Sequence, residues 1–105
     1  MHHGDGTQQI FQRENGLLFI SLHRHDYGEF YPGTGTHEDI GMDAGKGYTL
    51  NLPWNLGKVL FESDLGDNEY LFACEELLFP IIREYEPELI LVSCGFDSAK
   101  GDPKG

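Results

Sequence analysis

Three short apolar segments constrain the fold of this chain more than any other feature of its sequence. Leu17–Leu22 is an apolar run without polar alternation, which is typical of a strand buried on both faces of a parallel sheet. Tyr48–Leu52 and Leu89–Ser93 predict two further strands. Between the last two, Asp67 can cap a helix that runs to about Tyr85. This order of strand, helix and strand predicts an α/β fold with a mostly parallel sheet and a right-handed crossover.

The remaining segments predict one more helix and one long loop. A short helix is expected from about Thr7 to Arg13, with Asn15 and Gly16 as its stop. Residues 24–46 are rich in Gly, Pro, Asp, Thr and His and show neither the periodicity of a helix nor that of a strand. They therefore predict a loop that either forms the rim of a site or is disordered. Pro80 is expected to kink the second helix, whose apolar stripe comprises Tyr70, Cys74, Leu77, Leu78, Ile81, Ile82 and Tyr85.

Charge and cysteine content exclude several classes of partner. The 105 residues carry 18 acidic and 7 basic side chains, a formal net charge of −11, which repels phosphate backbones and anionic lipid headgroups. We therefore expect no direct nucleic-acid partner and no membrane partner. No apolar run approaches the roughly 20 residues of a membrane span, and no signal peptide is expected. Cys74 and Cys94 lack metal-type spacing and predict buried free thiols in the cytosol or nucleus.

Metal-binding side chains occur at two separate places in the sequence. His2, His3 and Asp5 stand at the beginning, and Asp97 follows the third predicted strand, where α/β proteins place their ligands. Imidazole nitrogen and carboxylate oxygen are ordinary zinc ligands, but a catalytic zinc needs about three of them. The alternatives are unrelated surface or capping residues and, for the histidine pair, the stub of a purification tag. Chemistry alone thus indicates only a partial site.

Four segments together are similar to a known family. HHGDGTQQIF, LLFISLHRHDYGEFYPGTG, GKGYTLNLPW and ELILVSCGFDSAKGDPKG resemble, in order and spacing, the central part of the class II zinc-dependent histone deacetylases. The segments GYTLNLPWN and GFDSAKGDPKG resemble most the cytoplasmic branch that acts on tubulin and polyamines. The resemblance implies an arginase/deacetylase-like α/β fold. It also implies that residues 1–105 form a central fragment of a longer catalytic domain.

The resemblance implies roles for the metal-binding side chains. His2 and Asp97 match two of the three zinc ligands of the family, and the third, an aspartate, would precede Met1. Asp5 matches a catalytic carboxylate that orients a histidine of another segment and fixes its tautomer. Its alternative role is a helix N-terminal carboxylate favoured by the helix dipole. His3 carries no implied role.

Two monovalent cation sites are also implied. Ser21 and the backbone of Leu22 match a potassium site beside the zinc, and the alternative is a strand serine bonded to a neighbour. Phe11 and Tyr48 resemble residues that contribute carbonyl groups to a second monovalent site. Both would be apolar core residues in any case.

Three residues match positions that bind substrate in the family. Phe30 and Tyr31 resemble the aromatic pair at the acetyl-lysine tunnel, where Tyr31 would stack on the alkyl stem. Lys104 matches a position at the tunnel mouth, and its alternative is a solvated loop lysine.

The implied reaction is the hydrolysis of an N-acetyl amide on a lysine or similar amine, with zinc polarising the carbonyl and activating water. The expected substrate is an acetylated histone or cytoplasmic protein, with acetylpolyamine as an alternative, and a corepressor complex is a further possible partner. The expected location is nucleus or cytoplasm. Because one ligand and the catalytic histidines are missing, residues 1–105 alone are expected to be inactive. The other hypothesis is a short, non-catalytic interaction module.

Overall fold

A computed structural model describes residues 1–56, 65–99 and 101–103 of the chain. The chain divides into two compact units. The first comprises Met1–Gly57 with Cys94–Gly105, and the second is Lys58–Ser93. Each unit is described by itself.

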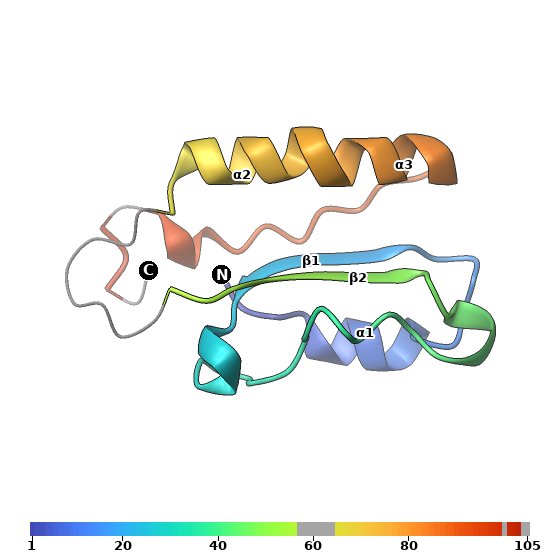
Figure 1. The fold of residues 1–105 in the computed structure, drawn as a ribbon, viewed down its shortest axis with the longest axis horizontal. Helices are drawn as coiled ribbons and strands as arrows, with labels where there is room; N and C mark the ends of the chain where they lie inside the picture. Colours follow the sequence, from blue (N-terminus) through green and yellow to red (C-terminus); the bar gives the residue numbers. More distant parts are fainter. Residues whose placement is uncertain (57–64, 100, 104–105) are drawn as a thin grey trace. The chain divides into compact units, whose positions relative to one another are not determined.

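The first unit is built on two parallel strands (Figure 1). β1 (Phe19–Arg24) pairs with β2 (Thr49–Trp54) in a register that sets Phe19 opposite Thr49 and Arg24 opposite Trp54. Both predicted strands and their parallel arrangement are confirmed. Each strand ends two residues later than predicted, because backbone pairing continues past the apolar residues into His23, Arg24, Pro53 and Trp54.

The buried face of this sheet is polar. Ser21 and His23 of β1 alternate with half-buried neighbours, and Thr49 and Asn51 of β2 do the same. Every buried side chain in the described part of this unit other than glycine is polar, namely His3, Gln8, Ser21, His23, His25, Thr49 and Asn51. The sequence predicted that β1 is buried by apolar contacts on both faces. Within the described residues this prediction is wrong, because the buried face of β1 carries polar side chains that form hydrogen bonds.

One helix and two short 3-10 turns complete this unit. α1 (Asp5–Phe11) begins and ends two residues before the predicted helix. The long connection between the strands contains η1 (Asp26–Gly28) and η2 (Asp43–Gly45) and is otherwise irregular, as predicted. The Met42 N–H donates to the carbonyl of Gln12 at 2.6 Å, so this connection is tied to the end of α1.

The second unit contains one interrupted helix. α2 (Asp67–Ala73) passes through a π-helical turn, η3 (Cys74–Leu78), into α3 (Phe79–Tyr85). The N-cap is Gly66, not Asp67, and the Glu69 carboxylate accepts the Gly66 N–H at 2.7 Å. Pro80 cannot donate a backbone hydrogen bond, and the wider π turn ends two residues before it, at Leu78. A kink of the helix axis at Pro80 stays a prediction.

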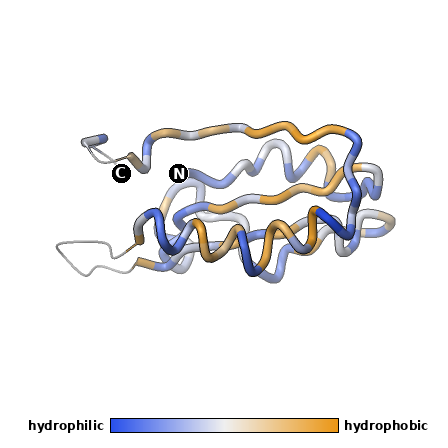
Figure 2. Tube along the Cα trace, turned by 90° about the horizontal axis from the view of Figure 1, so that it is seen from above, coloured by the Kyte–Doolittle hydropathy of each residue, from blue (hydrophilic) through white to orange (hydrophobic). Residues whose placement is uncertain are grey.

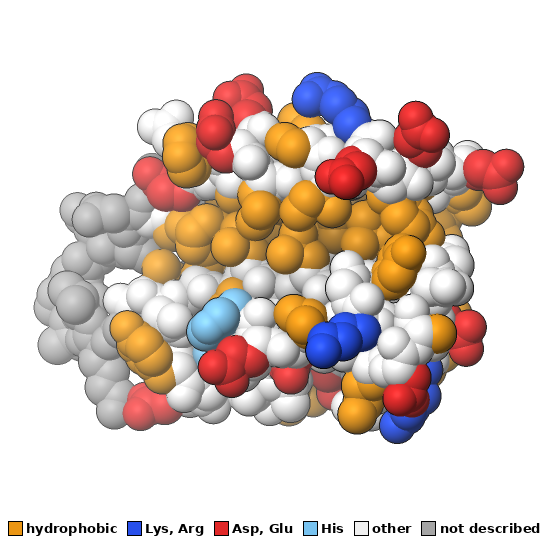
Figure 3. Space-filling model, turned by 45° about the vertical axis from the view of Figure 1, so that its right-hand side comes forward, with side chains coloured by type: hydrophobic (Ala, Val, Ile, Leu, Met, Phe, Trp, Pro, Cys, Tyr) orange, Lys and Arg blue, Asp and Glu red, His pale blue; other side chains and the backbone are white. Residues whose placement is uncertain are grey.

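The helix is amphipathic, as predicted. Figure 2 shows hydrophobic and hydrophilic residues alternating along its turns. Ala73 and Leu78 are its buried apolar residues, whereas Phe72 and Phe79 are exposed. Exposed hydrophobic side chains are visible on the molecular surface (Figure 3).

Two sequence predictions about the C-terminal part are wrong. Leu89–Ser93 forms no strand in this structure, and Leu91 and Val92 are 84% and 75% exposed. A strand requires a hydrogen-bonded partner, and within the described residues the sheet consists of β1 and β2 alone, so the crossover is not formed either.

Cys74 and Cys94 are free, as predicted, but Cys74 is half-buried and Cys94 exposed. Among the helices described, none has the length and apolar character to cross a bilayer.

Candidate functional site

The first unit brings His2 and Asp97 together from opposite ends of the sequence. His2 precedes α1, and Asp97 lies in the 3-10 turn η4 (Phe96–Ser98). The His2 Nε2 atom lies 3.3 Å from Asp97 Oδ2. The ammonium group of Met1 lies 3.2 Å from the same oxygen. The structure thus places both predicted zinc ligands side by side.

The surroundings of Asp97 favour its carboxylate form. Desolvation acts to raise the pKa of Asp97. A hydrogen bond and the charge of the Met1 ammonium oppose this, and the backbone amide of Asp97 and the charge of the His2 imidazole act in the same direction. With an ammonium at Met1 the pKa lies below the usual range for aspartate, whereas a preceding residue would replace that ammonium with a neutral amide. A carboxylate that stays ionised is the form that binds a metal ion.

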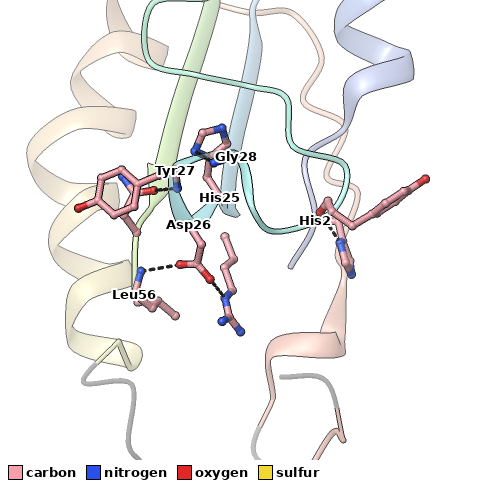
Figure 4. A network of polar contacts seen from close by, with 9 residues as sticks. His2, His25, Asp26, Tyr27, Gly28 and Leu56 are labelled. Atoms are coloured by element: carbon pink, nitrogen blue, oxygen red, sulfur yellow. Dashed lines mark hydrogen bonds and ion pairs between the residues drawn. The ribbon is translucent and has the colours of Figure 1, made fainter. Parts of the chain in front are cut away.

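The other ring nitrogen of His2 is fixed by the loop after β1. His2 Nδ1 lies 2.9 Å from the carbonyl oxygen of Tyr31, to which it donates in the tautomer protonated at Nδ1 (Figure 4). In this tautomer the lone pair of Nε2 is on the side of Asp97, where a metal ion bound to both groups would lie. Metal-binding histidines are commonly held this way, with the second N–H on a carbonyl or carboxylate.

The residues present fit part of a zinc site. Two tetrahedral zinc ligands at normal bond lengths stand roughly 3.3 Å apart, and the His2–Asp97 distance is the same. Within residues 1–56, 65–99 and 101–103, no group of three His, Cys, Asp or Glu side chains could hold a metal ion. His2 and Asp97 would therefore supply two ligands, and a third has to come from outside this group.

The predicted substrate aromatics lie beside His2. The Phe30 ring stacks on the imidazole, with centroids 4.9 Å apart and an interplanar angle of 19°. The Tyr31 ring meets it edge-on at 5.7 Å and 72°, and Tyr31 is 77% exposed. One exposed and one half-buried aromatic ring next to a pair of metal-binding groups can line the path of an alkyl stem. Lys104, the third predicted substrate residue, lies outside the described residues.

Phe30 is also held by a network that sequence reasoning missed. The Arg24 guanidinium lies over the Phe30 ring, with Cζ 4.6 Å from the centroid. Arg24 Nε donates to Asp26 Oδ2 at 2.6 Å, and Asp26 Oδ1 accepts the Leu56 N–H at 2.8 Å (Figure 4). The pattern Arg-x-Asp after a buried strand is the signal in the sequence, but only the structure shows what the two residues reach.

His3 has a structural role behind the site. Its Nε2–H donates to Gln8 Oε1 at 2.8 Å, and its Nδ1 faces Thr34 Oγ1 at 2.8 Å. The Asn51 side-chain amide donates to the same Gln8 oxygen at 2.8 Å. These polar contacts join three segments of the chain, and His3 is 5% exposed.

His23 is the most deeply buried side chain of the described chain, with no exposed surface. Its Nε2–H donates to the Gly35 carbonyl at 2.9 Å, so its Nδ1 accepts from the Ser21 hydroxyl at 2.9 Å. Burial lowers the pKa of His23 to about 4, and the nearby His3 and His25 act in the same direction, against the hydrogen bonds with Gly35 and Ser21. His23 is therefore neutral at pH 7.

The predicted monovalent-cation residues occupy ordinary structural positions. Ser21 bonds to His23, which is the alternative role considered from the sequence, and Leu22 is half-buried in β1. The carbonyls of Phe11 and Tyr48 accept the N–H groups of Glu14 and Phe19 at 2.9 Å each. Each carbonyl keeps a second lone pair. Phe11 is 36% exposed, so the expectation that it is a core residue is wrong.

Asp5 is the first residue of α1, in the turn where the helix dipole favours a carboxylate. This position agrees with its alternative role as a helix N-terminal acid. The orienting role needs a histidine from another segment and stays a prediction.

A family profile described as "Histone deacetylase domain" matches residues 1–105. Among curated proteins, the chain is 46% identical to "Histone deacetylase 15" of Arabidopsis thaliana, with all of the chain aligned to 18% of that protein. It is 47% identical to "Histone deacetylase 7" of Homo sapiens, with 98% of the chain aligned to 10% of that protein. The chain therefore spans less than a fifth of the length of these relatives.

Solved structures show the same relationship. The structure titled "Crystal Structure of HDA15 HD domain" superposes with a TM-score of 0.90 at 45% identity, over 99% of this chain and 28% of that one. "Structure of the histone deacetylase Clr3" gives a TM-score of 0.90 at 42% identity, over 99% of this chain and 17% of the other. The backbone of this chain is thus similar to one part of two longer deacetylase structures.

Proposed function

Because this chain belongs to the histone deacetylase family, we propose that it is a central segment of a class II deacetylase domain that hydrolyses N-acetyl-lysine in histones or other proteins. The single observation that supports the proposal most is the pairing of His2 with Asp97 at 3.3 Å across 95 residues of sequence. A histidine and an ionised carboxylate at zinc-ligand spacing, beside two aromatic rings, are what such a reaction needs.

The residues of this chain would bind and orient rather than transfer protons. His2 and Asp97 would hold the zinc ion, and the Tyr31 carbonyl fixes the imidazole for that purpose. Bound zinc supplies Lewis-acid activation of an amide carbonyl and of a water molecule. Phe30 and Tyr31 would pack against the methylene groups of the acetyl-lysine stem. Asp5 would orient a catalytic histidine from outside this chain.

The proposed setting follows from the same chemistry. An acetylated histone or cytoplasmic protein is the proposed substrate, in the nucleus or the cytoplasm and with a corepressor complex as a further partner. The net charge of −11 argues against direct contact with nucleic acid and suits a basic, acetylated protein tail. Potassium at Ser21 and Leu22, a second monovalent ion at Phe11 and Tyr48, and a rim role for Lys104 remain predictions.

The proposal predicts that His2→Ala or Asp97→Asn, made in the whole deacetylase that carries this segment, lowers kcat/KM on an acetyl-lysine peptide by at least about 100-fold. Loss of one of three protein ligands leaves the metal weakly held and wrongly placed. Peptide deacetylation and bound zinc per protein are measured together. His37→Ala is the matched control, because His37 is exposed and lies on the loop between the strands. Full activity in either ligand variant would contradict the proposal.

A second prediction concerns residues 1–105 alone. With two zinc ligands in place of three, we expect weak zinc binding and no deacetylase activity. Calorimetric titration with zinc measures the affinity, and His2→Ala and Asp97→Ala should each abolish what binding there is. Tight binding in a one-to-one ratio would show that the described residues form a more complete site than a pair.

A further inference from the structure

Arg24 and His2 both contact the ring of Phe30. The Arg24 Cζ atom lies 4.6 Å from the ring centroid, within the range of a cation–π interaction. The His2 ring stacks on Phe30 with centroids 4.9 Å apart and planes 19° from parallel. A change in the position of the Phe30 ring therefore changes the surroundings of a candidate zinc ligand.

Arg24 is itself held firmly. Its Nε–H donates to Asp26 Oδ2 at 2.6 Å, and the Asp26 side chain is only 12% exposed. Asp26 Oδ1 accepts the backbone N–H of Leu56, just after β2, at 2.8 Å. An ion pair with both carboxylate oxygens engaged and little solvent around the acid fixes the guanidinium better than an exposed pair does.

The same anchor fixes the backbone of η1. Asp26 and Tyr27 have φ angles of 49° and 57°, in the left-handed region that costs energy for residues other than glycine. The Tyr27 N–H donates to Asn55 Oδ1 at 2.8 Å (Figure 4), and the Leu56 N–H bonds to Asp26 as described. The end of β2 thus holds the loop that carries Phe30 in one conformation.

We propose that Arg24 is a positioning residue: it holds the Phe30 ring against His2 and so orients a zinc ligand and one wall of the substrate channel. The contacts run from the Leu56 backbone through Asp26 and Arg24 to Phe30 and His2. The inference rests on the proposed function for the roles of His2 and Phe30. The contacts themselves do not depend on that function.

Arg24→Met removes the charge and the Asp26 bond while keeping most of the side-chain volume. In the whole deacetylase that carries this segment, we expect it to weaken zinc binding, measured by competition with a chelator, about threefold to tenfold and to raise KM more than it lowers kcat. Phe30→Leu should have a similar effect. The double variant should be no worse than Phe30→Leu alone, because Arg24 acts through the ring. Arg24→Lys should recover part of the loss.

Arg13→Met is the matched control, since Arg13 is an exposed arginine paired with Asp43 and has no contact with Phe30. The chemical shifts of the His2 ring protons in the zinc-free protein give a readout that needs no activity. Arg24→Met should move them and Arg13→Met should not, because the ring current of Phe30 acts at the stacking distance. If they move but the wild-type protein neither binds zinc nor deacetylates, the proposed function fails and the positioning role stands. Unchanged shifts, or additive losses in the double variant, would overturn the positioning role.

Discussion

Gly35→Ala is expected to destabilise the protein by about 2–4 kcal/mol. Gly35 has a φ of +82°, which disfavours any side chain. A Cβ there would lie 2.6 Å from the His3 ring carbons Cγ and Cδ2 and 2.7 Å from His23 Nε2. Neither ring can move away freely, because each nitrogen of both rings faces a hydrogen-bond partner. Urea unfolding of the purified variant measures the loss.

Gly6→Ala is the control for this substitution. Gly6 lies within α1, and a Cβ at this position meets nothing within 4 Å. Alanine is favoured over glycine in a helix by up to about 1 kcal/mol, so this variant should be as stable as the wild type or more stable. Equal stability of the two alanine variants would mean that the His3 and His23 rings are not packed against Gly35 in solution.

β1 and β2 were predictable from the sequence because short apolar runs bounded by turn residues have a high propensity for strands. β1 and β2 follow from Leu17–Leu22 and Tyr48–Leu52 within two residues. Leu89–Ser93 is also a short apolar run, yet it forms no strand in this structure (Figure 1). Composition sets the propensity of such a segment, but pairing depends on a neighbour that its own sequence does not specify.

The polar core was not predictable, since histidine, glutamine and asparagine are found mostly at the surface. Their burial here depends on partners far away in sequence: Gln8 with Asn51, His3 with Thr34 and His23 with Gly35. No pattern of period 2 or 3.6 encodes such pairs. The glycine-rich character of residues 24–46 predicted a loop but not that Gly35 closes over two histidine rings.

The candidate site was predictable only in part for a similar reason. Side-chain chemistry alone indicated metal-binding residues at the two ends of the chain, and the resemblance to deacetylases paired His2 with Asp97. The structure adds how they are supported, through the Tyr31 carbonyl, the Phe30 ring and the Arg24–Asp26 pair. Supporting contacts of this kind depend on loop geometry. Short residue patterns do not contain that geometry.

Acid is expected to destabilise the protein through His23, by up to about 3 kcal/mol between pH 6.5 and pH 4. The pKa of this histidine is about 4 in the folded state, mainly because burial disfavours its charged form, against 6.5 for an ordinary histidine. Below pH 6.5 the unfolded chain therefore binds a proton that the folded chain does not. Stability is fully present above pH 6.5 and falls as the pH approaches 4, where the folded state is protonated as well.

His23→Gln tests this, because glutamine is neutral throughout and can still donate toward the Gly35 carbonyl. As the pH is lowered from 6.5 to 4, the free energy of unfolding of the wild type should fall more steeply than that of the variant. The difference between the two slopes should correspond to about one bound proton. The carboxylates are the same in both proteins, so their contribution to the pH dependence cancels when the two slopes are subtracted. His37→Gln removes an exposed histidine and should leave the wild-type slope unchanged. The titratable groups that face His23 are His3 and His25, and the charge of each acts to lower the pKa of His23 further. Identical slopes for wild type and His23→Gln would therefore mean that His23 is reached by water in the folded protein, and that the polar core opens in solution.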